Sequence, residues 1–331
     1  MANEKNASKN KLGINKMSII CAVVGLVVGL GIMALFIPER IAETKKGEQI
    51  VVEVGKENIT ADGLYTKLKE NSGLTVLLQE IDKTILNKKY KLTDDQKEEV
   101  EKQAKNYFDM YKQYYGYTEK QFLEANNFDD KNAFIEYLQY QYRTNLYYQE
   151  YLESKITDDD IKDYYDKNVY GDVKTKYIAV AKTSDDETAN KKEKELADEI
   201  LKKINKGTSY DDIVKEYKDK ITSKDLDYVA WNSTDVDSTY LTKLKDMKDK
   251  TNSKVVETSY GYTIIFREGS KDKAKLKDAK KDVIEAIKNK MNSEDDNLYN
   301  KAFIKLREDN KVKFYDTELQ KEYKDFCKQF E

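Results

Sequence analysis

The chain has 331 residues, of which 37% are charged, with 59 lysines and arginines against 62 aspartates and glutamates. A net charge of −3 at this density indicates a solvated surface and excludes a nucleic-acid-binding protein, which needs a clear basic excess. Histidine is absent and only two cysteines occur, which excludes a zinc site of Cys and His and imidazole-based catalysis. We expect neither a metal ion nor a cofactor.

Residues 18–37 form an uncharged apolar run near the N-terminus. A helix of this run rises about 1.5 Å per residue and spans about 30 Å, the hydrocarbon thickness of a bilayer. Four lysines and one acid precede it, so the positive-inside tendency places residues 1–17 in the cytoplasm and the bulk of the chain outside. We therefore predict a single-pass membrane anchor, followed by a linker over residues 38–49.

Two alternatives for the apolar run remain open. A cleaved signal peptide also has basic residues before an apolar stretch, but residues 36–39 lack a small-x-small cleavage site. Lipidation of Cys21 requires a lipobox, which Ile20 before the cysteine fits poorly. With the anchor in place, Cys327 is the only cysteine outside the membrane, and no intrachain disulfide is expected.

The segment after the linker begins with strand signals and continues with helix signals. Residues 50–60 indicate a short strand, a turn at Gly55 and a second strand, after which Thr60 caps a helix. Apolar spacing and capping boxes predict further helices at 74–89, from Thr93 to Gly116, from Thr118, at 130–155 and at 161–168.

The middle of the chain alternates between strand and helix signals. Residues 174–180 are predicted to form a strand, and a helix starts at Ser209. The segment 225–231 follows, and residues 254–266 indicate a polar lead-in, a Ser-Tyr-Gly turn and a buried strand. Gly261 supplies the backbone freedom that this turn requires.

Helix signals return beyond Gly269. An apolar stripe passes through Leu276, Ala279, Val283, Ile287, Met291, Leu298, Ala302 and Leu306. A helix with such a stripe needs a partner. The partner is either another helix of the same chain or a second copy of the chain in a coiled coil.

The order of elements in the middle of the chain resembles the parvulin, or PpiC-type, peptidyl-prolyl isomerase domain. Residues 174–180 correspond to the strand R-A-S-H-I-L-V that opens that domain, and residues 224–228 to its G-D-L-G-W segment. Residues 260–265 correspond to its closing Y-G-Y-H-I-I. The resemblance covers residues 172–269 and implies a small α/β domain, a four-stranded sheet ringed by helices.

The flanking segments resemble the chaperone part of SurA- and PrsA-type foldases. Residues 50–60 match the pattern V-x-V-G-x-x-x-I-T, and residues 156–165 match the junction I-T-D-D-D-I-K-D-Y-Y before the parvulin domain. In that family the C-terminal helix folds back onto the N-terminal helices. Residues 311–315 resemble the short strand that ends such foldases.

These resemblances imply an α+β fold with a helical SurA-N-like chaperone domain, completed by the C-terminal helix, and an inserted parvulin-like α/β domain. The predicted boundaries are 1–17 for a cytoplasmic tail, 18–37 for the transmembrane helix, 38–49 for the linker, 50–170 for the chaperone domain, 171–270 for the parvulin-like domain and 271–331 for the docking C-terminal helix.

Parvulins have two facing histidines, a nearby Cys or Asp, and Met and Phe lining a proline slot. By position the histidines fall at Tyr177 and Thr263, the acid at Asp219, and the slot residues at Val236 and Tyr240. In one interpretation Tyr177 and Thr263 rebuild a hydrogen-bonded pair and modest isomerase activity persists. In the other, both residues fill a core, and the domain only binds extended peptide or spaces the chaperone body.

Aromatic residues of the chaperone segment are candidate client contacts, with a role in the core as the alternative. The leading candidates are Tyr111 and Phe122, and the others are Tyr107, Phe108, Tyr114 and Tyr115.

The leading hypothesis is a membrane-anchored extracytoplasmic foldase that binds secreted, partly unfolded polypeptides and has weak or lost prolyl isomerase activity. The first alternative is an active isomerase of parvulin type. The second is an anchored structural protein that dimerises through its C-terminal helix. The expected partners are unfolded polypeptides, the membrane and, in a homodimer, a second copy of the chain.

Overall fold

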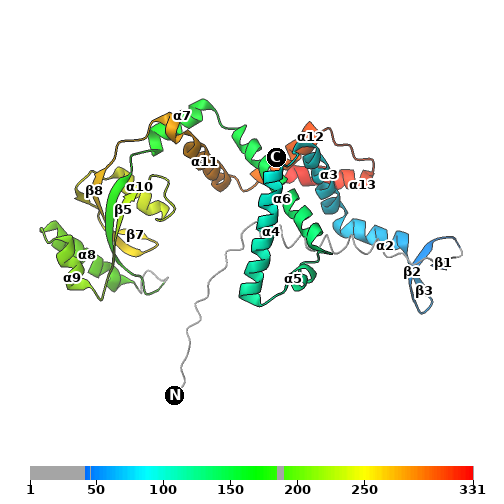
Figure 1. Ribbon diagram of the computed structural model, residues 1–331, viewed down its shortest axis with the longest axis horizontal. Coiled ribbons are helices and arrows are strands. Elements are labelled where there is room, and N and C mark those ends of the chain that lie inside the picture. The colour runs from blue at the N-terminus through cyan, green and yellow to red at the C-terminus, as the bar shows by residue number, and fades with distance from the viewer. Residues whose placement is uncertain (1–41, 45, 185–189, 331) are drawn as a thin grey trace, which may run out of the picture. The chain divides into compact units, whose positions relative to one another are not determined.

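The computed structural model describes residues 42–44, 46–184 and 190–330 (Figure 1). The predicted anchor at residues 18–37 lies outside these ranges. Within them, no helix combines the length and the apolar character needed to cross a bilayer.

The contacts within the chain divide it into two compact units. One comprises the described residues up to Tyr151 together with those from Asp296 onward, and we call it the helical unit. The other comprises Leu152–Asp295, and we call it the sheet unit. The sheet unit extends on both sides beyond the predicted parvulin-like domain, residues 171–270, whose boundaries remain a prediction.

The helical unit begins with a small antiparallel sheet. Its strands are β1 (Ala42–Glu43), β2 (Gln49–Val54) and β3 (Glu57–Thr60), in the order β1-β2-β3. Strands β2 and β3 confirm the predicted strand, turn at Gly55 and strand. The hydroxyl of Thr60 accepts a hydrogen bond from the backbone N–H of Gly63 at 3.1 Å, which caps the following helix as predicted.

The predicted helices of this unit are confirmed. They are α2 (Ala61–Leu68), α3 (Leu74–Lys89), α4 (Asp94–Tyr115), α5 (Glu119–Ala125) and α6 (Lys131–Glu153). A π-helical turn that was not predicted, η2 (Lys69–Gly73), joins α2 to α3. Both predicted capping boxes form, at Thr93 and at Thr118, where each threonine exchanges hydrogen bonds with a glutamine three residues later.

An aromatic core joins α4, α5 and α6. The rings of Phe108, Phe122 and Phe134 lie 5.1–5.5 Å apart between centroids, and two of the three contacts are edge-on. Val100 and Leu138 are buried in the same cluster. The periodic apolar positions of these helices are therefore core residues, as amphipathic spacing predicts.

The last part of the chain packs on α3 within the helical unit. It consists of α12 (Leu298–Asp309), α13 (Thr317–Cys327) and the 3-10 turn η3 (Lys328–Phe330). The guanidinium of Arg307 on α12 donates two hydrogen bonds, of 2.8 and 2.6 Å, to the carboxylate of Asp82 on α3. The Tyr147 hydroxyl on α6 donates to the Ala302 carbonyl at 2.9 Å.

The predicted C-terminal stripe is divided between two helices. Its first half lies on α11 (Leu276–Glu294), where Ala279, Val283 and Ile287 are buried against α7 (Asp158–Asn168) of the sheet unit. This half of the stripe therefore has a partner within the chain, so the structure gives no support to a free coiled-coil helix there.

The short strand predicted at residues 311–315 is not formed, and that prediction is wrong. Residues 312–315 are irregular in the described structure. The backbone N–H of Val312 donates to the Arg307 carbonyl at 3.1 Å, so it closes the end of α12 instead of joining a sheet.

The sheet unit contains a five-stranded antiparallel sheet. Its strands are β4 (Val173–Val180), β5 (Thr222–Val229), β6 (Thr251–Asn252), β7 (Val256–Thr258) and β8 (Gly261–Ser270). The order is β5-β4-β8-β6, and β7 also pairs with β8. The fifth strand, relative to the predicted four, arises because the segment before β8 pairs with it twice.

Helices cover both faces of this sheet. On one face, α8 (Lys191–Asn205) and α9 (Tyr210–Tyr217) bury an apolar cluster with β4 and β8. On the other face, α10 (Ser238–Asp246) buries a second cluster with the same two strands. Figure 1 shows α8 and α9 on the opposite side of the strands from α10.

Candidate functional site

The candidate isomerase positions lie on the two central strands of the sheet unit. In β4, Tyr177 and Ala179 belong to the cluster with α10, whereas Ile178 belongs to the cluster with α8 and α9. The register of β4 with β8 pairs Tyr177 with Ile265 and Ala179 with Thr263. Because side chains alternate along a strand, Tyr177 and Thr263 share the face that α10 covers.

Three tyrosines gather on this face. The ring of Tyr177 stacks on that of Tyr260, with centroids 4.8 Å apart and planes 8° apart, and meets the Tyr240 ring edge-on at 6.1 Å. Val236 is buried in the same cluster. We call Tyr177, Tyr240 and Tyr260 the tyrosine cluster. The structure thus brings Val236 and Tyr240 to Tyr177, as the family positions imply.

The Thr263 hydroxyl is bonded within the β7–β8 hairpin. It lies 2.7 Å from the hydroxyl of Thr258 and donates to the Gly261 carbonyl at 3.2 Å. The contacts of Thr263 therefore differ from the hydrogen-bonded pair with Tyr177 that one sequence interpretation assumed.

Tyr240 is fully buried, and its hydroxyl is hydrogen-bonded inside the sheet unit. It lies 2.8 Å from the Thr175 hydroxyl, which itself donates to the Phe266 carbonyl at 2.7 Å. A threonine hydroxyl has one hydrogen, so Tyr240 is the donor to Thr175. Burial raises the pKa of Tyr240 and of Tyr177 above the ordinary phenol value, so both are neutral at physiological pH.

The site therefore presents aromatic surface and neutral hydroxyls. No covalent chemistry is needed for prolyl isomerisation, which must overcome a barrier of about 20 kcal/mol set by amide resonance. An aromatic face can hold a proline ring, but the ring of Tyr260 already covers Tyr177, which is 4% exposed. A peptide can reach Tyr177 only if Tyr260 moves.

Comparison with known proteins places this chain in a family. A family model for the PPIC-type PPIASE domain matches residues 156–281. The chain is 28% identical over 249 residues to Foldase protein PrsA of Bacillus subtilis, covering 74% of this chain and 76% of that protein. It is 30% identical over 226 residues to Foldase protein PrsA 1 of Listeria innocua, covering 66% of this chain and 68% of that protein. The chain belongs to the PrsA foldase family.

A solved structure agrees with this family at the level of the fold. The crystal structure of foldase protein PrsA from Streptococcus pneumoniae superposes with a TM-score of 0.55. The superposition covers 83% of the present chain and 98% of the Streptococcus pneumoniae chain, and the two are 18% identical. The similarity therefore extends over both units of this PrsA-family chain.

Asp219, the candidate acid, lies apart from the tyrosine cluster in the described structure. It is exposed in the turn between α9 and β5. Helix α9 packs on the face of the sheet opposite to Tyr177 and Thr263. The structure therefore groups Tyr177, Thr263, Val236 and Tyr240 without Asp219.

A different acid, Asp237, joins the start of α10 to the turn before β8. Its carboxylate caps α10 by accepting from the Tyr240 backbone N–H at 2.7 Å, and it accepts from the Ser259 N–H at 2.5 Å. Burial raises the pKa of this carboxyl, but these backbone hydrogen bonds outweigh burial and bring the pKa below its ordinary value. Sequence reasoning missed Asp237, although Asp before a helix is a capping signal.

Tyr260 was the other missed residue of the site. It belongs to the Ser-Tyr-Gly turn, and its hydroxyl donates to the Asp235 carbonyl at 2.9 Å. The turn signal was visible in the sequence, but the direction of the tyrosine ring depends on the β7–β8 pairing.

The two leading client-contact candidates lie in the core of the helical unit. Phe122 is 4% exposed, and its ring meets the half-buried Tyr111 edge-on at 4.7 Å. Burial favours the core interpretation for Phe122. By contrast, Tyr114 and Tyr115 at the end of α4 are 73% and 66% exposed.

Proposed function

We propose that this chain is a membrane-anchored extracytoplasmic foldase that holds secreted, partly unfolded polypeptides while they fold. In this proposal residues 18–37 anchor the protein in the membrane, with both described units outside. The relatives in the PrsA family are named foldases, and this name supports the assignment.

The observation that carries the proposal is the uneven distribution of exposed apolar side chains. Among the described residues, eleven large hydrophobic side chains are exposed, and Tyr228 is the one that lies in the sheet unit. The others lie in the helical unit: Val51, Val52, Val54, Ile59, Tyr65, Met110, Tyr114, Tyr115, Tyr117 and Tyr315. Val52 pairs with Ile59 across β2 and β3, and Val54 lies two residues along β2 on the same face, so these three side chains adjoin. A contiguous exposed apolar patch of this kind marks an interaction site.

Weak and reversible capture suits this surface. Each Å² of apolar area that a client buries contributes about 25 cal/mol, so a few side chains give transient binding without a cofactor. Val52, Val54 and Ile59 lie on the paired strands β2 and β3, which offer an extended surface to an unfolded chain.

We expect residues 45–331 to suppress aggregation of an unfolded secreted protein, measured by light scattering at equimolar ratio. Replacing Val52, Val54 and Ile59 together with threonine should weaken suppression, because threonine keeps the β-branched shape and removes apolar area. The variant Tyr228→Thr is the matched control and should suppress aggregation like the unchanged chain. Absence of suppression by the unchanged chain would contradict the foldase proposal.

We further propose that prolyl isomerase activity is weak or lost. Both family histidines are replaced, the Thr263 hydroxyl is bonded within its own hairpin, and Tyr260 covers Tyr177. The match to the PPIC-type family model supports the alternative of an active isomerase.

A protease-free assay of an X-Pro peptide by NMR exchange should therefore show no measurable acceleration at micromolar protein. Clear acceleration would favour the active isomerase. In that case Tyr177→Phe separates two roles, because loss of activity would assign the rate to the hydroxyl and unchanged activity would assign it to packing.

A further inference from the structure

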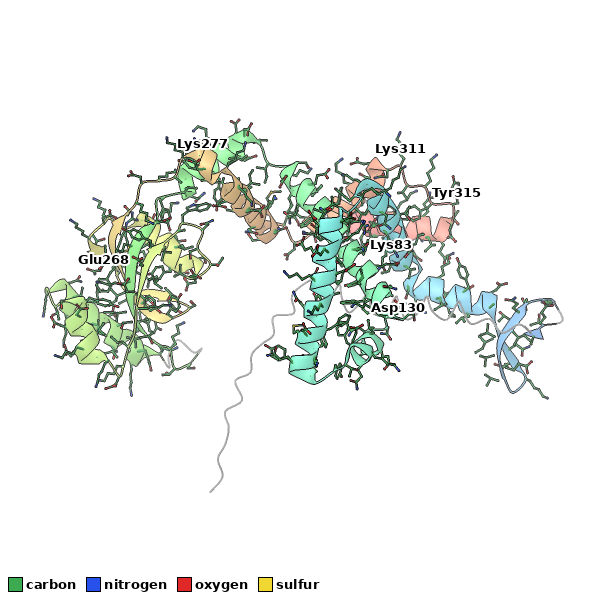
Figure 2. The ribbon with its side chains drawn as sticks, in the orientation of Figure 1. Lys83, Asp130, Glu268, Lys277, Lys311 and Tyr315 are labelled. Carbon is green, nitrogen blue, oxygen red and sulfur yellow. The ribbon has the colours of Figure 1, made fainter. Side chains whose placement is uncertain are left out.

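A basic pocket opens in the helical unit, whereas the tyrosine cluster belongs to the sheet unit. It has a volume of about 580 Å³ and lies between the second half of α3, the start of α4 and the middle of α6. Figure 2 marks Lys83 on α3. Four cations line the pocket: Lys83, Lys91, Lys97 and Arg143. This volume lies in the range of about 300–1,000 Å³ that is usual for ligand sites.

The lining of the pocket follows from helical spacing. Glu136, Gln139, Tyr140 and Arg143 lie three, four and seven residues apart on α6, so they share one face of that helix. The same spacing brings polar groups of α3 to the pocket wall. The pocket is thus lined by residues of α3, α4 and α6, together with Lys91 and Leu92 of the loop that joins α3 to α4.

The Arg143 guanidinium is held in place through one nitrogen, and its two terminal nitrogens have no hydrogen-bond partner among the residues that the structure describes. Its Nε donates to the Tyr90 carbonyl at 3.1 Å, which fixes the plane of the group. Partial burial lowers the pKa of Arg143. Within the described ranges no carboxylate forms an ion pair with Arg143, Lys83 or Lys91, whereas Lys97 pairs with Asp94 at 2.9 Å.

The end of α3 does not explain these cations. A lysine in the last turn of a helix compensates the partial negative charge there, and Lys88 and Lys89 occupy that turn in α3. The effect fades within one turn. Lys83 lies earlier on the helix and Lys91 lies beyond it, so both positions add positive charge that the helix itself does not require.

We propose that this pocket binds an acidic segment of a polypeptide, so that the foldase holds clients by charge as well as by apolar contact. The inference rests on the proposed foldase function. Arg143 would pair with an Asp or Glu side chain of the client through its fork of N–H donors, and Lys83 and Lys91 would pair with neighbouring acids.

The rest of the lining favours a peptide over a small inorganic anion. Asn87 and Gln139 carry both donors and acceptors, which match the N–H and C=O groups of a peptide backbone. The Glu136 carboxylate can accept a hydrogen bond from a peptide N–H. Leu92 and Tyr140 add apolar surface for side chains between the acids.

The test uses the full-length protein in non-ionic detergent and a fluorescein-labelled peptide of alternating glutamate and glycine. Fluorescence anisotropy should show binding that weakens as the salt concentration rises, because salt screens ion pairs. A peptide with glutamine in place of glutamate should bind at least about tenfold more weakly, since glutamine removes the negative charge that strengthens each hydrogen bond to Arg143 and the lysines.

The double variant Arg143→Gln with Lys83→Gln should lose binding by a similar factor. The matched control Lys102→Gln with Lys105→Gln removes the same charge from exposed positions of α4 and should bind like the unchanged protein. Unchanged far-UV circular dichroism and melting temperature establish that the variants are folded.

Three outcomes would overturn the proposal. These are equal binding of the glutamate and glutamine peptides, equal loss in the pocket and control variants, and displacement of the peptide by millimolar inorganic phosphate, which would indicate a small-anion site. The aggregation assay separates this inference from the foldase proposal. If the chain suppresses aggregation but does not bind the acidic peptide, the pocket proposal is wrong and the foldase proposal stands. If the chain binds the peptide but does not suppress aggregation, only the foldase proposal is contradicted.

Discussion

Replacing Asp82 with asparagine is expected to destabilise the helical unit by about 3–5 kcal/mol, the usual cost of breaking a buried ion pair on one side. Asp82 and Arg307 are each 6% exposed at the side chain, and two hydrogen bonds join them. Burial raises the pKa of Asp82, and the guanidinium opposes this rise. Asparagine would leave the Arg307 charge buried without a counter-charge.

This loss would be a large part of a domain's stability, which is about 5–15 kcal/mol in total. Because Arg307 lies on α12 and Asp82 on α3, the pair joins segments 225 residues apart in the chain. Urea unfolding followed by far-UV circular dichroism should therefore show early loss of helix. Trp231, the single tryptophan, lies in the sheet unit. Its fluorescence should therefore report an unchanged unfolding transition of that unit.

Two variants sharpen this experiment. Asp309→Asn removes the exposed pair of Lys305 with Asp309 on the same helix and should change stability by at most about 1 kcal/mol. Replacing Asp82 with leucine and Arg307 with methionine together should recover much of the loss, because apolar residues often substitute well for a buried pair. A midpoint for Asp82→Asn equal to that of Asp309→Asn would show that the buried pair does not stabilise this unit.

The sequence was informative where local signals determine local structure. The capping boxes at Thr93 and Thr118 and the helical spacing of α6 predicted the helices that the structure contains. Each of these signals acts within a few residues, because a cap or an apolar stripe depends on neighbours along one helix.

Pairing between distant segments could not be predicted from local signals. The apolar stripe on α11 and α12 appeared continuous, but one part packs on α7 and the other on α3. An apolar stripe can be buried against any apolar face of suitable size, so the stripe alone does not identify the helix on which it packs. The Asp82–Arg307 pair likewise gave no local signal, because its two residues are 225 positions apart in the chain.

The site showed a related limit at Asp227, which stands where the parvulin pattern has glycine. Asp227 has a φ of +52°. Its backbone N–H donates to the Asp225 carboxylate at 2.9 Å, and aspartate tolerates this left-handed conformation better than most residues. Asp227 therefore adopts a left-handed conformation that glycine also adopts readily, and a sequence pattern alone does not reveal this.

The second large effect is expected at Gly261, where replacement by alanine should destabilise the sheet unit by about 3–5 kcal/mol. Its φ of +108° is a conformation that residues with a side chain rarely adopt. An added Cβ would lie 2.2 Å from the Val180 carbonyl oxygen and 2.9 Å from the Ala181 Cα. These are backbone atoms at the end of β4, and moving them would break its pairing with β8.

Gly207 separates the two causes of this effect, because its φ of +100° is similar and an added Cβ there would meet nothing within 4 Å. Gly207→Ala should therefore cost only the backbone strain, about 1–3 kcal/mol, and Gly261→Ala should cost that strain and the collision. Unfolding followed by Trp231 fluorescence measures both variants in the same unit. Equal losses of unfolding free energy in the two variants would mean that β4 and β8 can move apart enough to accept the added methyl group. The close approach of Gly261 to β4 would then not be what fixes Tyr260 against Tyr177.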